Sequence, residues 1–101
     1  MDKTRLTLTV RLWLNGNDLR AFEAFEAKVA GIMSKHGGRI EHVIRPDRSD
    51  DSPFEIHTVT FPDEQSFAAY RNDPESMALA AEREQVIART EISRLDTDQH
   101  G

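Results

Sequence analysis

The sequence contains no cysteine, which excludes a disulfide framework and any thiol chemistry. No apolar run approaches the roughly 20 residues that cross a bilayer, so no membrane partner is expected. The first 14 residues alternate apolar and polar side chains and include Arg11, so no signal peptide is expected. A cytoplasmic location is the expectation, because a reducing compartment suits a cysteine-free chain.

Clusters of lysine and arginine are also missing. Residues 1–50 hold nine Lys and Arg against seven Asp and Glu, and residues 51–101 hold four against eleven. The net charge of −5 therefore comes from the second half of the chain. Because phosphate contacts need grouped basic side chains, no nucleic-acid partner is expected.

Motifs for nucleophilic or nucleotide chemistry are absent as well. The sequence has no G-x-S-x-G elbow and no glycine-rich phosphate loop. Asp47, Asp50 and Asp51 lack the glycine and the spacing of a calcium-binding loop. Neither a metal ion nor a cofactor is expected.

The composition is that of one globular domain. Of the 101 residues, 38% are apolar and 31% are charged, which suits a folded domain with a small two-layer core. No linker or low-complexity segment divides residues 1–101. An ordered core is expected over about residues 5–95, and the polar tail 96–101 is expected to be mobile.

Two periodicities define the predicted elements. Residues 6–14 alternate in the period of a strand, whereas apolar side chains recur every three or four residues over 19–36. Asn17 or Asp18 caps this helix, so the turn signal at residues 15–16 is not a hairpin. Further strands are predicted at 39–46, 54–61 and 88–95, with a second helical region at 63–87.

Two helix-start signals lie only ten residues apart in that second helical region. Asp63 caps a short first piece, and Asp73 recaps a second piece that has Pro74 at its first helical position. Phe67 and Tyr70 are expected to pack the first piece on the sheet. Acidic caps repel phosphate, so the break is predicted to shape the fold and not to bind an anion.

The element order β-α-β-β-α-β predicts an α+β, ferredoxin-like sandwich, with a four-stranded antiparallel sheet and two helices on one face. The stretches "KHGGRI" and "FPDEQSFAAYRNDPE" resemble the dimeric α/β-barrel superfamily. Within it, the chain looks most like uncharacterised bacterial families related to antibiotic-biosynthesis monooxygenases. The resemblance implies two sheets paired into a barrel, with a cavity inside the barrel or between sheet and helices.

The residue pattern independently favours a homodimer. If the leucines of the first strand lie under the helices, Thr7, Thr9, Arg11 and Trp13 point out of the opposite face. Some of Val43, Phe54 and Ile56 join them in either hairpin register. A second copy of the chain is expected to cover this helix-free face, because a monomer would leave it wet and partly apolar.

His42 and His57 form the first candidate site. In a hairpin symmetric about residues 49–50, they lie opposite each other with Cβ atoms about 5 Å apart. Two imidazoles there could bind a metal or transfer protons. However, Glu41 and Glu55 are expected on the opposite faces from their neighbouring histidines, and a one-residue slip separates the two histidines. A polar cross-strand pair without metal is the preferred prediction.

Arg11 and Trp13 form the second candidate site. They occupy alternate positions of a central strand and point toward the predicted barrel interior. A guanidinium beside an indole could hold an aromatic or anionic ligand. In the alternative, Trp13 fills the dimer interface and Arg11 pairs with Glu41, Glu55 or Glu91. Both interpretations remain open.

Two functions of different classes follow. The first is a dimeric α/β-barrel protein that binds a small molecule in a cavity of the barrel, with Arg11, Trp13, His42 and His57 as ligand-binding candidates. The alternative is a cofactor-independent monooxygenase or isomerase acting on an aromatic or polyketide-like substrate. Oxygenases that the chain resembles use a phenolate-like substrate to reduce oxygen. The resemblance assigns no catalytic residue here, and whether the protein is an enzyme stays open.

Overall fold

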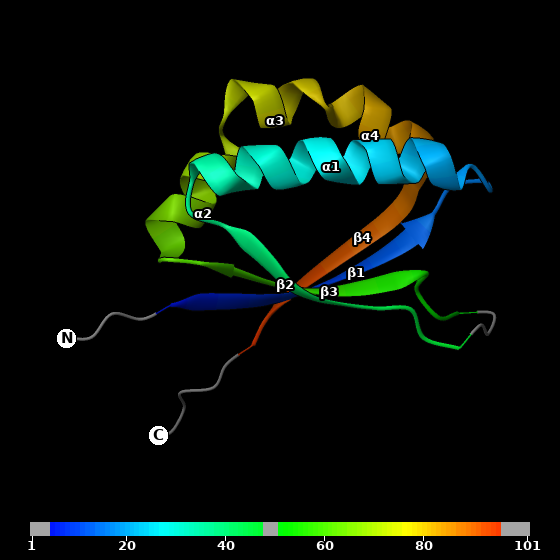
Figure 1. Cartoon of the computed structure of the whole chain (residues 1–101), viewed down its shortest axis with the longest axis horizontal. Coiled ribbons are helices and arrows are strands. Elements are labelled where there is room, and N and C mark those ends of the chain that lie inside the picture. The colour runs from blue at the N-terminus through cyan, green and yellow to red at the C-terminus, as the bar shows by residue number, and fades with distance from the viewer. Residues whose placement is uncertain (1–4, 48–50, 96–101) are drawn as a thin grey trace.

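The computed structural model describes residues 5–47 and 51–95 and contains four strands and four helical segments within them (Figure 1). In chain order these elements are β1 (Leu6–Leu14), α1 (Leu19–Lys35), β2 (Arg39–Ile44), β3 (Glu55–Phe61), α2 (Glu64–Arg71), α3 (Pro74–Ala78), α4 (Ala80–Val86) and β4 (Ile87–Arg94). The predicted tail and the centre of the predicted hairpin turn lie outside the described residues. Among those described, no helix is long and apolar enough to cross a membrane.

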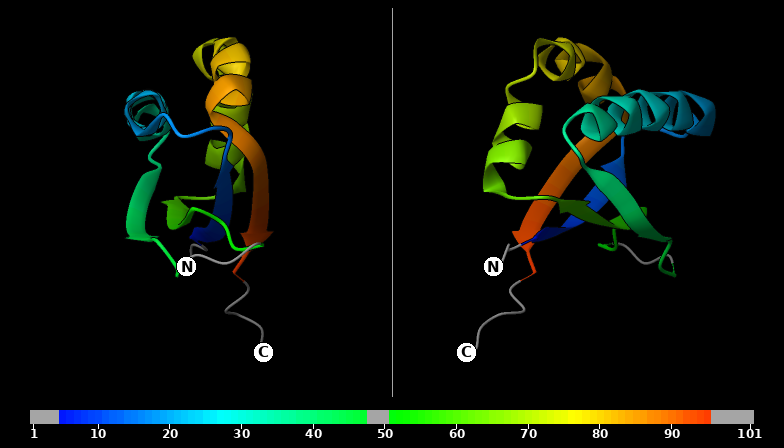
Figure 2. Two further views of the ribbon diagram at one scale, coloured as in Figure 1. Left: turned by 90° about the vertical axis from the view of Figure 1, so that its right-hand side faces the viewer. Right: turned by 60° about the vertical axis from the view of Figure 1, so that its left-hand side comes forward.

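The sheet has the strand order β2-β3-β1-β4, and every described strand pair is antiparallel. The helical segments lie on one side of the sheet and leave its other face uncovered (Figure 2). The predicted fold class is therefore confirmed, including the central place of β1. The helix-free face carries the positions that alternate with the leucines of β1.

The core fills the layer between sheet and helices in two adjoining clusters. At one end, Leu8 of β1 packs with Met33, Val59, Phe61 and Phe67; at the other, Leu12 packs with Phe22, Phe25, Val86 and Ile87. Val10 contacts both clusters. Phe22, Phe25, Phe61 and Leu8 are the largest fully buried side chains, so each contributes a large apolar area to the layer.

The helix ends follow the sequence signals. Asp18 caps α1 by accepting a hydrogen bond from the Ala21 amide at 3.0 Å. Gly37 leaves the helix with φ of +78°, and a Cβ at Gly38 would lie 2.5 Å from the Phe61 ring. The glycine pair is therefore required both for the turn and for close packing. The backbone N–H of Asn15 donates to the Val86 carbonyl at 2.9 Å, and α1 begins at Leu19, which confirms that no hairpin forms there.

At the helix break, Asp73 connects the start of α3 to the end of α1. Asp73 accepts a hydrogen bond from the Glu75 amide at 2.8 Å, lies 2.8 Å from His36 Nε2 and forms an ion pair with Lys35. The bond to His36, the Glu75 amide and Lys35 together lower the pKa of Asp73 to about 2. The cap predicted at Asp73 is confirmed, and the same carboxylate binds His36 at the end of α1. A further break, at Leu79, was not predicted.

The register of β2 against β3 differs from the symmetric hairpin. An irregularity between Ile40 and His42 shifts the pairing, so that His42 lies opposite Thr58 and Val43 lies opposite His57. Directly opposed residues share a face of the sheet. The predicted pairing of the two histidines is therefore wrong, because a bulge in β2 moves them to opposite faces.

Candidate functional site

The candidate site begins with two polar side chains of β3 that face the helices. Glu55 pairs with Leu12 and His57 with Val10, so both share the leucine face of β1. Both are buried, at 5% and 4% exposure. The expectation that Glu55 points away from His57 is wrong, because residues two apart on a strand lie on the same face.

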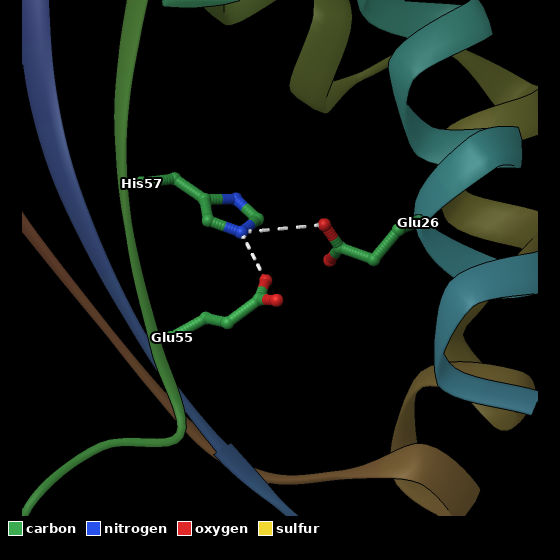
Figure 3. Close-up of side chains that lie close together, drawn as sticks. All are labelled: Glu26, Glu55 and His57. Carbon is green, nitrogen blue, oxygen red and sulfur yellow. Dashed lines mark hydrogen bonds and ion pairs between the residues drawn. The ribbon is translucent and has the colours of Figure 1, made fainter. Parts of the chain in front are cut away.

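The third member of the site is Glu26, which comes from α1. Its side chain points across the layer toward Glu55 and His57 (Figure 3). His57 Nε2 lies 2.7 Å from Glu55 Oε1 and 3.4 Å from Glu26 Oε1. These three side chains, named here the interior triad, could hold a proton, a cation or the hydroxyl group of a ligand.

Sequence reasoning missed Glu26, although a signal was present. It follows Phe25 directly, four residues after Phe22 and three before Val29, and all three contribute to the core layer. Residues at these spacings share one face of a helix. A carboxylate within an apolar stripe is the anomaly that marks the site.

Arg45 extends the triad toward the surface. Its Nε lies 2.7 Å from Glu55 Oε2, the carboxylate oxygen that does not contact His57. The guanidinium also stacks on Phe54 at 4.6 Å. Arg45 and Phe54 line a hollow of about 550 Å³ at this end of the molecule. A half-exposed cation therefore holds a buried carboxylate in place.

The electrostatic balance of the triad centres on Glu26. Burial raises the pKa of Glu26, and the negative charge of Glu55 raises it further, while His57 and Arg83 lower it. Burial is the largest of these effects. The charged form of Glu26 is therefore disfavoured at this place in the core layer.

A small cavity of about 80 Å³ lies beside the triad, between the sheet and the helices. Glu26, His57 and Arg83 contribute its charged lining. The rest of its wall is mostly apolar and includes Val10, Val29, Met33, Ile40, Phe67 and Tyr70. An apolar wall with a few convergent polar groups is typical of small-molecule sites.

Arg11 and Trp13 lie on the helix-free face, away from this cavity. Arg11 donates to Ser93 Oγ at 3.4 Å, while Glu91, its neighbour on β4, is bound by Arg89. The Arg89 guanidinium also lies 4.2 Å from the centre of the Trp13 ring. Neither Arg11 nor Trp13 lines the small cavity beside the interior triad, but Trp13 does line the hollow of about 550 Å³ together with Arg45 and Phe54.

His42 is exposed and shares the helix-free face with Thr58. Of the four candidates Arg11, Trp13, His42 and His57, only His57 belongs to the interior triad. The structure joins it to Glu26 and Glu55, which sequence reasoning did not select.

The chain matches no protein-family model, and no curated protein matches it significantly. Among solved structures, it is similar to a dabb family protein with a ferredoxin-like fold from Mesorhizobium loti, at 15% identity and a TM-score of 0.69, over 90% of this chain and 94% of that one. It is also similar to SnoaB, a cofactor-independent oxygenase from Streptomyces nogalater, at 16% identity and a TM-score of 0.70, over 95% of both chains.

A third similar structure is a dimeric protein of unknown function and ferredoxin-like fold from Bacteroides fragilis, at 9% identity and a TM-score of 0.59, over 93% of this chain and 98% of that one. These similarities establish the fold: a small α+β protein with a ferredoxin-like fold. At such identities the likeness establishes the fold, and function rests on the site itself.

Proposed function

We propose that the protein binds a small, mostly apolar molecule with one hydrogen-bonding group in the cavity between sheet and helices. The observation that carries this proposal is the interior triad, of which half-buried Glu26 and buried His57 lie in the wall of a mostly apolar cavity. The apolar part of the ligand packs on Val10, Val29 and Phe67. Its polar group contacts Glu26 or His57.

The cost of the triad supports a functional role. Burying charged groups costs free energy even when they are paired, and apolar side chains of similar volume are often equally stabilising. Burial raises the pKa of Glu26, as expected for a carboxylate that is costly to charge in this layer. Folding alone would be served by leucine or methionine at these positions.

The size of the cavity sets a condition on binding. Its volume of about 80 Å³ is well below the roughly 300 Å³ of ordinary ligand pockets. A ligand larger than a few atoms therefore requires the helices to move away from the sheet. The cover from α2 to α4 consists of three short pieces, which suits such a movement.

The second part of the proposal is a homodimer through the helix-free face. Trp13, Ile44 and Ile56 place apolar area there among Arg11, Arg89 and Glu91. Ile44 is 56% exposed in the single chain. A two-fold interface would bury these apolar groups and let the mixed charges pair between copies. One structural neighbour is described as dimeric.

The alternative function is a cofactor-independent monooxygenase or isomerase acting on an aromatic or polyketide-like substrate. The observation that favours it is the contact between His57 and Glu55, since a carboxylate that orients an imidazole is a common arrangement for a general base. A base at an apolar cavity suits removal of a proton from a phenol-like substrate. SnoaB, which shares the fold, is described as a cofactor-independent oxygenase.

Ligand binding is tested by titrating 2-naphthol, an apolar molecule with one hydroxyl group, into the protein in a chelator-containing buffer. We expect saturable NMR shifts of residues around Glu26 and His57. Glu26→Gln should weaken binding at least about tenfold, as for a hydrogen bond to a charged group. Arg11→Leu, on the opposite face, is the matched control and should not change the affinity.

Two outcomes would contradict the proposal. Saturable shifts that gather around Arg11 and Trp13, and that Arg11→Leu abolishes, would move the ligand site to the helix-free face. Equal affinity in the parent protein and Glu26→Gln would show that the triad does not bind the ligand.

For the alternative function, oxygen uptake with an electron-rich polycyclic phenol should require His57. Uptake that persists in His57→Asn would exclude a role for His57 as the base.

A further inference from the structure

The interior triad also has the composition and convergence of a metal site. One ligand atom from each of Glu26, Glu55 and His57 can be chosen so that all three lie within 4.8 Å of one another. Two of the residues come from β3 and one from α1, and both elements pack in the core layer. Their positions are therefore fixed by the fold and not by a loop.

We propose that Glu26, Glu55 and His57 bind one divalent transition-metal ion, with an open coordination position toward the cavity. One imidazole nitrogen and two carboxylate oxygens suit zinc, manganese or ferrous iron better than magnesium, which prefers oxygen ligands and several waters. This inference goes beyond the proposed binding of a small molecule and does not rest on it.

The distances fit this assignment with a small adjustment. Metal–ligand bonds of about 2.0–2.2 Å place neighbouring ligand atoms about 3–3.5 Å apart. The 3.4 Å between His57 Nε2 and Glu26 Oε1 already meets that spacing. The 2.7 Å between His57 Nε2 and Glu55 Oε1 is a hydrogen bond. Loss of its proton and a rotation of the carboxylate would open the site.

The surroundings support the role of each ligand. Two carboxylates balance the charge of a divalent ion, so the ion would relieve the repulsion between Glu26 and Glu55. Arg45 binds the outer oxygen of Glu55 at 2.7 Å and so orients that ligand from behind. The cavity beside Glu26 and His57 provides space for a water on the open position.

The competing interpretation of the same geometry is a proton shared between His57 and the two carboxylates. The two states differ in metal content, which can be measured directly. The test uses untagged full-length protein that has been treated with a chelator and dialysed. Zn²⁺ alone is then titrated by calorimetry, and the metal content of protein as purified is measured by mass spectrometry.

We expect the parent protein to bind one Zn²⁺ per chain and to melt at a higher temperature when the ion is present. Glu26→Gln, which keeps size and removes charge, should weaken this binding at least about tenfold. His42→Asn removes an exposed histidine outside the triad and is the matched control, with unchanged affinity. Circular dichroism establishes that each variant is folded.

His57→Asn provides a second test if it folds, and it should abolish binding. If it does not fold, the Co²⁺ complex of the parent protein replaces it, because visible absorption bands report nitrogen and oxygen coordination at a single site. Absence of stoichiometric uptake, or equal affinity in the parent and Glu26→Gln, would overturn the metal site and leave the shared proton. Neither result bears on 2-naphthol binding, which is measured with chelator present.

Discussion

Charged side chains on the two faces of the sheet differ in their exposure and in their partners. On the covered face, Glu55 and His57 are almost inaccessible, and their partners Glu26 and Arg45 reach them from α1 and from the end of β2. On the helix-free face, Arg89 and Glu91 are exposed and pair with each other along β4. The two sets lie on different strands of one sheet, the first on β3 and the second on β4.

The difference separates two uses of polar side chains. A buried charge needs a fixed partner within the protein, because water cannot replace a lost contact. Exposed charges can exchange protein partners for water or for a second chain at little cost. This difference is the reason for proposing the ligand site on the covered face and the dimer interface on the helix-free face.

The largest effect is expected from breaking the buried network. Glu55→Leu should lower the free energy of unfolding by about 3 kcal/mol, the low end for a broken buried pair, because Glu26 remains beside His57 at 3.4 Å. Urea denaturation measures the change. Glu91→Leu on the helix-free face is the control and should stay within about 0.5 kcal/mol. Equal effects of the two substitutions would mean that the faces do not differ.

The next effect concerns the interface and compares two neighbouring residues of β2. Ile44 and Val43 are similarly exposed, at 56% and 53%, but pair with Ile56 and His57 and so lie on opposite faces. Ile44→Asp should weaken homodimer formation about 10–100-fold, since it removes a large apolar contact. Val43→Asp should leave the association constant unchanged in sedimentation equilibrium. A monomeric parent protein at micromolar concentration would contradict the proposed dimer.

Much of the fold could be predicted from sequence, because it depends on local signals. The period-two pattern of β1, the cap at Asp18 and the restart at Asp73 each specify their own element. The β-α-β-β-α-β order then restricts the topology. The break at Leu79 was missed because no side-chain cap marks it.

The candidate site was harder to predict because its residues come from two elements, α1 and β3, and no local signal joins them. The irregularity near His42 shifts the pairing of β2, and no residue type announces it. Glu55 was assigned to the wrong face of its strand. Residues two apart on a strand share a face, so Glu55 had to lie on the same face as His57. Glu26 required attention to a charge inside an apolar helix face, a signal that was present in the sequence.

A smaller effect on stability is expected at Asp73, a second carboxylate that is nearly buried and paired. It is only 9% exposed, like Glu55, but sits at a helix start, where His36, Lys35 and the Glu75 amide surround it. Asp73→Ala should lower the melting temperature by about 4–8 °C through loss of the cap. Asp73→Asn keeps the cap, so its melting temperature should fall by less.

The pH dependence of Asp73 follows from its pKa of about 2, against an ordinary value of 3.8. A carboxyl group with a lowered pKa stabilises the folded state above its unfolded pKa. This contribution should therefore be complete above about pH 4 and be lost between about pH 4 and 2. The difference in melting temperature between the parent protein and Asp73→Asn should shrink over that range. A constant difference would show that the charge contributes nothing.

The smallest effect on stability is expected at Arg11. Its substitution directly tests whether the helix-free face lacks buried charge. Arg11 lies on the central strand β1 but contacts only a serine hydroxyl at 3.4 Å among its described hydrogen bonds. Because water reaches this half-buried guanidinium, Arg11→Leu should change the free energy of unfolding by no more than about 0.5 kcal/mol, or raise it. Thermal denaturation at low protein concentration measures this. A variant that unfolds or dissociates would show that Arg11 makes an essential ion pair across the dimer, and the helix-free face would then contain buried charge as well.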